Sequence, residues 1–429
     1  MRDTLIVALY KNKGDRRDCN NYRGISLLSV VEKVFARAVL SSLQKIADRV
    51  YPESQCGFRS ARSTIDMVFS VRQLQEKCRE QNQPLFMAFI DLTKAFDLVS
   101  RSGLFAVLAK TGCPPKLLDI ICSFHTGMKG RVLVDGVISE EFDVKSGVKQ
   151  GCVLAPTLVG IYFYLLLKNA FGASIEGVLL HTRSDGKLFN LARLKALTKV
   201  KEVSICELLF ADDAALVANS ESELQCLLDR FPTSCQLFGL TISTSKTQVM
   251  GQGAPFGTGI SLEGNSLEAV HQFKYLDCIL SDTLSLDSEL STRIGKAATV
   301  ISSLTKRVWQ NRKLSLETKI AVYRSCVLSI LMYGSESWTC YAIQERKLNS
   351  FHMRNLRRLL GITWKDKVAN ETVLQRTGMS TILSLLRQRR LRWVGHVKRM
   401  AEDRIPKLIL LQPTPRGFAK CWPFKATFS

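Results

Sequence analysis

The sequence has few groups that could bind zinc and no closely paired cysteines. Its 13 cysteines include no Cys-x-x-Cys pair, and none of its five histidines lies near a cysteine cluster. Zinc modules and disulfide-rich secreted scaffolds both need closer spacing than this. We therefore expect no zinc, reduced thiols, and a nuclear or cytoplasmic, intracellular location.

The sequence also lacks a targeting segment and a long hydrophobic run. Residues 1–10 contain a short apolar run without a cleavage-type pattern of small residues, so no secretory signal is predicted. The longest apolar stretch, residues 152–167, is too short for a comfortable membrane span and contains Pro156 near its start. It predicts a buried helix that follows a loop, and no membrane partner is expected.

Acidic residues are scarce in the last third of the chain. Residues 291–429 contain 27 Lys and Arg against 7 Asp and Glu, whereas residues 1–290 contain 33 against 31. A segment with this imbalance repels itself unless a polyanion is nearby. Nucleic acid is therefore a better predicted partner than a membrane surface, because no strongly amphipathic helix stands out.

Apolar periodicity divides the chain into three stretches and predicts an α+β fold. Residues 1–84 combine an extended start with helices predicted at residues 27–46 and 63–78. Residues 85–285 alternate apolar strands and helices, and residues 286–429 are basic and helical. Asp135-Gly136 is a strong hairpin signal between residues 131–134 and 141–144. Residues 413–429, rich in Pro and Gly, are expected to be loosely ordered.

Two acidic sites lie at the ends of apolar strands. Asp212 and Asp213 form the turn between residues 205–210 and 214–218, and Asp91 ends the strand 85–90. Adjacent carboxylates disfavour joint ionisation, and a divalent cation such as Mg²⁺, which prefers carboxylate oxygens, removes that conflict. Separately, an Asp-rich turn and a helix cap explain these residues equally well. Together they suggest the paired metal ions of phosphoryl transfer.

Seven ordered segments resemble the reverse transcriptases of non-LTR (LINE-type) retrotransposons. Two of them resemble fingers motifs: residues 11–28, which contain K-N-K-G-D and N-Y-R-G-I-S-L-L, and residues 55–66, Q-C-G-F-R-S-A-R-S-T-I-D. The palm motifs follow in order as F-I-D-L-T-K-A-F-D (89–97), G-V-K-Q-G-C-V-L-A-P (147–156), L-F-A-D-D (209–213), G-L-T-I-S-T-S-K-T (239–247) and F-K-Y-L (273–276). Each segment is weakly specific alone, whereas the ordered set is highly specific.

The resemblance implies a right-hand polymerase and a set of site residues. It implies fingers at 1–84, a palm with an antiparallel sheet at 85–285, and a basic helical thumb and C-terminal region at 286–429. By this resemblance Asp91 and Asp212 hold two Mg²⁺ ions, with Asp213 as a supporting carboxylate. The implied substrates are an RNA template, a DNA primer and dNTPs. The sequence does not fix the oligomeric state.

The resemblance also assigns residues that contact the nucleotide. It places Phe96 where a bulky ring blocks a ribose 2′-hydroxyl, and Gln150 and Gly151 in the loop beside the incoming nucleotide and template. The remaining assignments are cationic: Arg23, with Lys11 or Lys13, grips the triphosphate, and Lys246 assists as pyrophosphate leaves. Alternatives remain open, namely a core phenylalanine, a simple turn and solvated surface charges.

Some features depart from the family pattern. Asp277 stands where the family usually has Gly, in the hairpin that holds the primer, and a carboxylate there is expected to weaken primer binding. Ala155 replaces the usual Ser before Pro156, and Gly24 replaces a frequent Pro. We expect neither an endonuclease ahead of the polymerase nor an RNase H domain, which suggests a truncated element.

The sequence therefore predicts an RNA-directed DNA polymerase that uses two metal ions. A first alternative is a catalytically inactive relic that keeps only nucleic-acid binding, and a second is a polymerase of the intron-maturase or telomerase kind. In the C-terminal region four arginines, Arg387, Arg389, Arg390 and Arg392, flank Trp393. We expect a phosphate-binding helix there with Trp393 buried.

Overall fold

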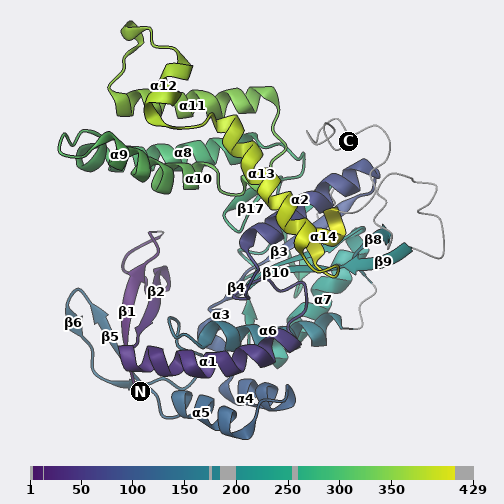
Figure 1. Cartoon of the computed structure of the whole chain (residues 1–429). Helices are drawn as coiled ribbons and strands as arrows, with labels where there is room; N and C mark the ends of the chain where they lie inside the picture. Colours follow the sequence, from purple (N-terminus) through teal and green to yellow (C-terminus); the bar gives the residue numbers. More distant parts are fainter. Residues whose placement is uncertain (1–2, 13, 173–175, 184–199, 254–258, 411–429) are drawn as a thin grey trace.

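The computed structural model describes residues 3–12, 14–172, 176–183, 200–253 and 259–410. Helices and strands mix along the first two thirds of the chain, and helices alone follow after residue 286 within the described part (Figure 1). The predicted mixture of α and β structure is therefore confirmed. No described helix is both long and apolar enough to cross a bilayer.

A five-stranded sheet, in the order β10-β11-β3-β13-β16, forms the centre of the molecule. Its middle strand, β3, is apolar and buried at every position. Successive side chains of a strand point to opposite faces, so Phe86, Ala88 and Ile90 enter one core while Leu85, Met87 and Phe89 enter the other. The strands are β3 (Leu85–Ile90), β10 (Glu207–Phe210), β11 (Asp213–Ala218), β13 (Gln248–Gln252) and β16 (Glu268–Ala269).

Helices cover both faces of this sheet. One core receives side chains from α1 (Val30–Val50), α6 (Ala155–Phe171) and α7 (Glu221–Leu237). The other receives α2 (Thr64–Glu80) and α14 (Ile405–Leu410), together with the hairpin of β17 (Gln272–Tyr275) and β18 (Cys278–Ser281). The buried helix predicted in the apolar stretch of residues 152–167 is thus confirmed as α6, which has Pro156 in its first turn.

A second sheet, in the order β2-β1-β5-β6, lies near the start of α1 (Figure 1). Here the predicted hairpin is partly wrong. Across the Asp135-Gly136 turn, β5 pairs with residues 137–138, while residues 142–143 pair farther back with residues 129–130 of the same strand. The strands are β1 (Thr4–Tyr10), β2 (Tyr22–Leu27), β5 (Lys129–Val134), β6 (Val137–Ile138) and β7 (Phe142–Asp143).

Several short strands and helices complete this part of the chain. Next to β3, β4 (Leu92–Thr93) pairs with β12 (Thr241–Ile242). Two other small hairpins are β8 (Val178–Arg183) with β9 (Val200–Ile205) and β14 (Ser261–Leu262) with β15 (Asn265–Ser266). The short helices are η1 (Cys19–Asn21), α3 (Ala95–Leu98), α4 (Arg101–Lys110) and α5 (Pro115–His125).

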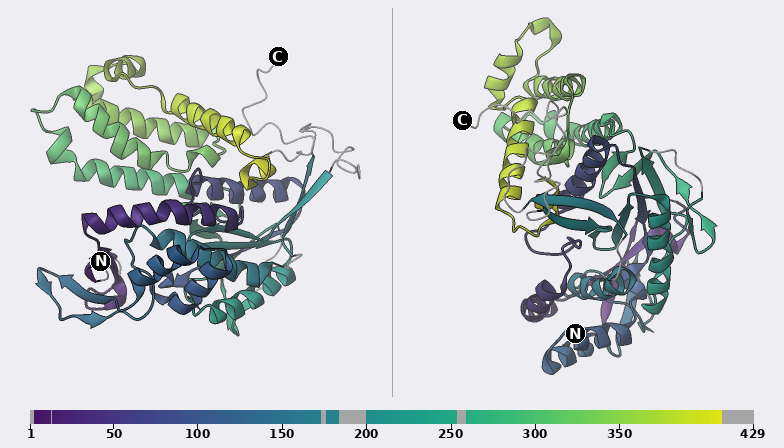
Figure 2. Two further views of the ribbon diagram at one scale, coloured as in Figure 1. Left: turned by 60° about the horizontal axis from the view of Figure 1, so that its bottom comes forward. Right: turned by 90° about the vertical axis from the view of Figure 1, so that its right-hand side faces the viewer.

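The C-terminal helices build a core of their own, and α13 then runs back to α2 (Figures 1 and 2). Trp393, on α13, is buried against Phe69, as predicted. Only some of the four arginines near Trp393 are free to form the predicted phosphate-binding surface. Arg390 is buried, and Arg389 donates to the Met332 carbonyl. The elements are α8 (Asp287–Ser303), η3 (Thr305–Trp309), α9 (Leu316–Val322), η4 (Tyr323–Leu328), α10 (Ser329–Leu331), η5 (Ser335–Ser337), α11 (Ala342–Leu360), η6 (Trp364–Asp366), α12 (Asn370–Thr377) and α13 (Ile382–Arg399).

Most helix and strand predictions agree with the structure to within a few residues. Strand 85–90 has the predicted bounds, and the second predicted helix begins after the capping box of Ser63 and Asp66. The first predicted helix is shorter at its start, because residues 22–27 form β2 and Ser29 caps α1. The expectation of loose order at residues 413–429 falls outside the described residues.

Glu207 of β10 gives a prediction about stability. One carboxylate oxygen accepts a 2.7 Å hydrogen bond from Ser54, whereas the other is buried without a hydrogen-bond partner among the described residues. Burial raises the pKa of Glu207 to about 7. The folded state therefore holds this proton at a pH where the unfolded chain has lost it, so stability falls as pH rises from about 4.5 to 7.

We expect Glu207→Gln to raise the thermal midpoint at pH 8 and to change it little at pH 4.5. The gain at pH 8 should be roughly 1–3 kcal/mol, since one pKa unit corresponds to about 1.4 kcal/mol. Thermal melts of both proteins at the two pH values measure it. An equal shift at both values would contradict the assignment.

Candidate active site

The turn that carries Asp212 and Asp213 lies at the edge of the central sheet next to Asp91. Phe210 pairs with Asp213 across the turn, and Ala211 takes a left-handed conformation with φ of 59°. Ala214 of β11 lies opposite Ile90 of β3 in antiparallel register. The next position along each strand is therefore Asp213 on one side and Asp91 on the other. The fold thus brings together two acidic sites that are more than 100 residues apart.

The three carboxylates influence one another electrostatically. Burial raises the pKa of Asp212, Asp91 raises it further, and the Arg23 guanidinium opposes that shift. Burial together with the charges of Asp212 and Asp91 raises the pKa of Asp213 to about 6. Each shift records the cost of crowding negative charge in a partly desolvated place. Asp212 is half-buried and Asp213 is exposed, so a cation from solvent can reach the crowded carboxylates and relieve their repulsion.

A cavity of about 330 Å³ lies beside these carboxylates. It is lined by Asp91, Asp213 and Lys246 on one side and by the β17–β18 hairpin on the other. The Lys246 ammonium group lies 2.8 Å from one Asp91 oxygen. Phe89 and Phe273 stack at 3.9 Å and fix the hairpin against the sheet. Asp212 does not line this cavity, but the charges of Asp91 and Arg23 both affect its pKa.

The donor set fits a divalent cation, although a closed metal cluster is not formed. Across the described ranges, no group of three His, Cys, Asp or Glu side chains is close enough to hold a metal ion. Asp91 and Asp213 nevertheless present carboxylate oxygens to one cavity, and such oxygens are the ligands that Mg²⁺ prefers. That Asp91, Asp212 and Asp213 together bind metal ions stays a prediction.

Gln55 holds the Asp212-Asp213 turn, called the acidic turn below, through hydrogen bonds to Ala211. The sequence did not predict this role. This buried side chain accepts a hydrogen bond from the Ala211 N–H (2.9 Å) and donates one to the Ala211 carbonyl (3.2 Å). A Cβ on Gly57 would come within 2.2 Å of the Ala211 nitrogen, so only glycine fits there. The pattern Gln-x-Gly was visible in residues 55–57, but its partner lies 156 residues away.

Phe96 lies on α3, directly after β3 and β4. Its ring is half-buried and meets the Phe58 ring edge-on, with 6.4 Å between centroids. Its carbonyl accepts a hydrogen bond from the Val148 N–H at 2.9 Å. The structure thus joins Phe96 to the predicted nucleotide loop. It also places Phe96 beside the segment that contains Gln55.

Gln150 and Gly151 lie where that loop meets the second sheet. The Gln150 carbonyl accepts a hydrogen bond from Ser26 of β2 at 2.8 Å. Gly151 has a φ of 107°, and a Cβ there would come within 2.8 Å of the Ser26 carbonyl oxygen. Arg101 fixes the start of the loop by donating to four backbone carbonyls, those of Gly147, His125, Val144 and Ser146.

The predicted phosphate-gripping cations lie on or near the β1–β2 hairpin. Arg23, on β2, is exposed and close enough to Asp212 to affect its pKa. The Lys11 ammonium group donates to the Asn20 carbonyl at 2.8 Å and is near Asp97 rather than the acidic turn. Lys13 lies outside the described residues. Arg23 is thus within electrostatic range of Asp212, whereas Lys11 is within electrostatic range of Asp97.

Asp277 is not an isolated negative charge. Leu276 and Asp277, both left-handed, form the turn of the β17–β18 hairpin. The Asp277 carboxylate pairs with Lys274 at 2.9 Å, Lys296 at 2.7 Å and Arg293 at 3.0 Å. Hydrogen bonds from these cations hold the pKa of Asp277 far below its usual range, even though its partial burial acts to raise it. The Asp277 carboxylate, which was expected to repel a phosphate, is thus surrounded by cations.

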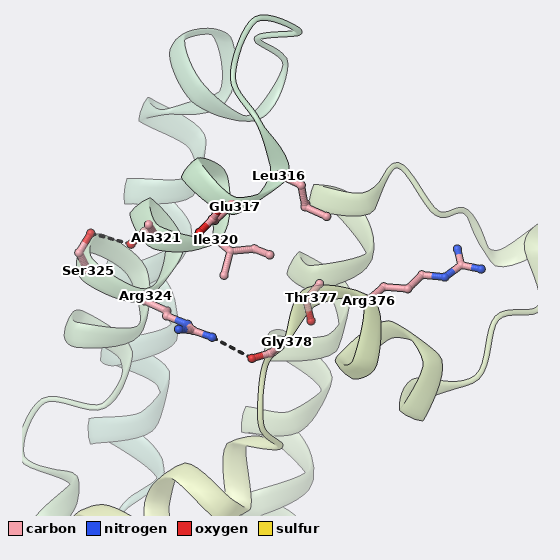
Figure 3. Close-up of a pocket in the computed structure, with 9 residues that line it drawn as sticks. All are labelled: Leu316, Glu317, Ile320, Ala321, Arg324, Ser325, Arg376, Thr377 and Gly378. Carbon is pink, nitrogen blue, oxygen red and sulfur yellow. Dashed lines mark hydrogen bonds between the residues drawn. The ribbon is translucent and has the colours of Figure 1, made fainter.

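A larger cavity, of about 900 Å³, lies among the C-terminal helices (Figure 3). It is lined by residues of α9, η4 and α12, and contains none of the predicted site residues. Arg324 reaches across it to donate to the Gly378 carbonyl at 2.8 Å. Glu317 and Arg376 also line the cavity, but the Arg376 side chain points away from the other lining residues (Figure 3).

Comparisons with known proteins place this site in a family. The family described as "Reverse transcriptase (RNA-dependent DNA polymerase)" matches residues 10–280. The chain is 26% identical to the RNA-directed DNA polymerase from mobile element jockey of Drosophila melanogaster, over 84% of this chain and 38% of that protein. It is 25% identical to the probable RNA-directed DNA polymerase from transposon BS of the same organism, over 97% and 45%.

Solved structures with a similar arrangement are more distant. A structure of apo telomerase from Candida tropicalis superposes with a TM-score of 0.48 and 12% identity, over 96% of this chain and 63% of that one. The RNA-dependent RNA polymerase of a human picobirnavirus gives a TM-score of 0.45 and 11% identity, over 87% and 60%.

The curated relatives are much longer than the matched region. The chain spans 38 to 45% of the length of jockey and BS, whose names describe the whole proteins. The family match, however, covers more than half of this chain and includes Asp91, the Asp212-Asp213 turn and the loop at Gln150. The chain therefore belongs to the reverse transcriptase (RNA-dependent DNA polymerase) family and is related to the reverse transcriptases of non-LTR retrotransposons.

Proposed function

We propose that this chain is an RNA-directed DNA polymerase that extends a primer 3′-hydroxyl with dNTPs on an RNA template. The observation that carries the proposal is the meeting of Asp91 with the Asp212-Asp213 turn at one sheet edge, beside a cavity. Crowded carboxylates of this kind suit metal-assisted transfer of a nucleotidyl group. The Arg23 guanidinium close to them suits a triphosphate.

We assign the three parts of a right-handed polymerase to the chain as follows. The fingers comprise residues 1–84, the palm residues 85–285, and the thumb with the C-terminal region residues 286–429. The central sheet with its acidic edge supports the palm assignment. The positive surplus of residues 291–429 supports a role in binding template and primer.

Asp91, Asp212 and Asp213 are the residues that would hold two Mg²⁺ ions. When bound, the ions would lower the pKa of the primer hydroxyl and neutralise charge on the triphosphate. The protein's own contribution is positioning. Gln55 fixes the turn from behind, and Lys246 neutralises Asp91 and lies beside the same cavity, where it can meet the leaving pyrophosphate.

The nucleotide would lie between the palm and the second sheet. Arg23, with Lys11 or Lys13, would bind the triphosphate, and Gln150 and Gly151 would pack against the nucleotide and template. Phe96 would exclude a ribose 2′-hydroxyl by bulk. Its ring is held by Phe58, so the site is rigid enough to discriminate by shape.

Primer extension by the purified protein tests the proposal. We expect dNTP-dependent extension on an RNA template that requires Mg²⁺ and stops when the ion is chelated. Binding of the primer–template without extension at any Mg²⁺ or Mn²⁺ concentration would support the alternative, a relic that only binds nucleic acid.

Gln55 provides a test of turn positioning. We expect Gln55→Ala to slow extension about 10- to 100-fold with little change in primer–template affinity, because a buried N–H of Ala211 loses its partner. Steady-state extension and a binding titration measure the two quantities. Gln344→Ala is the control, because Gln344 is also buried and hydrogen-bonded but lies on α11. An equal loss of rate in both variants would refute a specific role.

Asp277 provides a test of primer binding. We expect Asp277→Asn to tighten primer–template binding about 3- to 10-fold at low salt and to steepen the salt dependence by about one unit, since three cations lose their internal partner. Asp135→Asn removes the same charge from another left-handed turn position and serves as the control. Unchanged or weaker binding in Asp277→Asn would show that the carboxylate does not compete with the primer backbone.

A further inference from the structure

The last described residues do not join the core of the C-terminal helices but pack into a core beside the central sheet. α13 runs from the C-terminal helices toward α2, and α14 packs alongside α2 (Figures 1 and 2). Ile405 and Ile409 of α14 are buried in the same core as Cys56 and Leu208. The last described helix is thus part of the palm core and does not belong to the helical thumb alone.

Arg404, just before α14, makes the polar contacts between this part of the chain and residues 53–66. Its buried guanidinium donates to the Glu53 carboxylate at 2.8 Å, the Asp66 carboxylate at 3.1 Å and the Ala61 carbonyl at 3.4 Å. Arg62 binds Glu53 through two hydrogen bonds of 2.7 and 2.6 Å. Two carboxylates and two guanidinium groups therefore balance in a largely buried network that joins Arg404 to residues 53–66.

The loop of residues 52–62 depends on such outside contacts. Phe58 and Ala61 have φ values of 57° and 56°, in the left-handed region that residues other than glycine seldom adopt. Conformations of this kind persist only where the surroundings impose them. Arg404 supplies part of that restraint at Glu53 and Ala61, because it bonds near both ends of the loop.

The opposite side of the same loop contacts the proposed catalytic machinery. Gln55 clamps Ala211 in the acidic turn, and the Cys56 N–H donates to the Leu209 carbonyl at 2.9 Å. The Ser54 carbonyl accepts from the Leu209 N–H at 3.0 Å, and the Phe58 ring supports Phe96. One loop thus links the C-terminal strap, defined here as residues 400–410, to both the metal-binding turn and the residue that excludes ribonucleotides.

We propose that Arg404 is a positioning residue for polymerisation, acting through loop 52–62 on the Asp212-Asp213 turn and on Phe96. The strap then serves the active site and is not primarily a clamp for nucleic acid. The proposal rests on the polymerase function proposed above. Its consequence is that a change some 190 residues after the acidic turn alters the rate and nucleotide selectivity of the site, while primer–template affinity stays the same.

Hydrogen exchange tests the coupling without requiring activity. We expect Arg404→Met to speed amide exchange at Leu209 and Ala211 about tenfold or more, because the loop that pairs with them loses its restraint. Lys407→Met is the matched control. Lys407 is equally buried, but the partners of its ammonium group, the Lys398 and Met400 carbonyls and Glu402, all lie within the C-terminal segment. Unchanged exchange in Arg404→Met, or an equal increase in both variants, would overturn the proposal.

Extension kinetics then separate positioning from loss of folded protein. Per active site, we expect Arg404→Met to lower kcat about tenfold and the preference for dNTPs over rNTPs several-fold, with primer–template Kd unchanged and partial rescue by Arg404→Lys. The double variant Gln55→Ala/Arg404→Met should be no slower than Gln55→Ala alone. Additive effects, or an unchanged nucleotide preference, would contradict coupling through the loop. An inactive parent chain would refute the proposed function. The exchange result alone would then show whether Arg404 restrains loop 52–62.

Discussion

Replacing Asp91 or Asp212 by Asn should lower primer extension about 10³-fold or more at saturating Mg²⁺. Asn keeps the shape of Asp but supplies neither the negative charge nor two carboxylate oxygens to a cation. Catalysis of phosphoryl transfer depends mostly on positioning and charge neutralisation, so the loss should fall on the rate of extension. Single-turnover extension from a pre-bound primer measures it.

Folding should survive these substitutions. The carboxylates repel one another, and the Lys246–Asp91 pair is partly exposed and contributes little to stability. We therefore expect thermal midpoints equal to or above that of the parent chain. Asp119→Asn, on the exposed face of α5, serves as the control for loss of one negative charge. Extension that persists in Asp91→Asn or Asp212→Asn would rule out the proposed site.

The second large effect concerns Phe96. We expect Phe96→Ala to reduce discrimination against ribonucleotides about 100-fold, equivalent to about 3 kcal/mol, because the space of the ring becomes open to a 2′-hydroxyl. Incorporation of dNTPs should fall by less than about tenfold. The measurement is kcat/KM for a matched dNTP and rNTP pair on one RNA template.

A control for this result is available in another phenylalanine. Phe142→Ala removes an exposed ring from β7, on the second sheet, and should leave discrimination unchanged. If Phe96→Ala still rejects ribonucleotides like the parent chain, the ring is a core residue. That outcome would support the alternative that Phe96 is a core phenylalanine without a role in nucleotide selection.

Local patterns predicted the strands that carry the acids. β3 is a continuous apolar run, and the strand–turn–strand around Asp212 and Asp213 is equally clear, so neighbouring residues alone fix both elements. The meeting of Asp91 with that turn was expected because two acidic sites at strand ends suggest paired metal ions, and the resemblance to a family implied the same. The register of β3 against β11 supplies it in the structure.

The sequence alone did not predict the contacts between distant segments. Gln55 reads as an ordinary polar residue until its partner Ala211 is known, and Arg404 reads as one more positive charge in a basic region. Arg390 was expected on a phosphate-binding surface, but α13 turns that position inward as it crosses to α2. These roles depend on tertiary packing, which the local pattern of charge does not encode.

The turn at Asp277 has neighbours that the sequence pattern did not predict. A lone carboxylate in a primer-binding hairpin was expected to repel phosphate. Arg293 and Lys296 of α8 lie within 3.0 Å of it, together with Lys274 of the hairpin itself. Whether the hairpin attracts or repels a primer is thus set by a helix that begins after the hairpin has ended.

The most direct test of the central claim counts metal ions. Electron paramagnetic resonance can measure Mn²⁺ bound to the complete chain in complex with an RNA template, a 3′-blocked primer and a dNTP. We expect two ions bound per protein in the parent chain and at least one fewer in Asp91→Asn. The same number of bound ions in both proteins would contradict a metal site built from Asp91 and the Asp212-Asp213 turn.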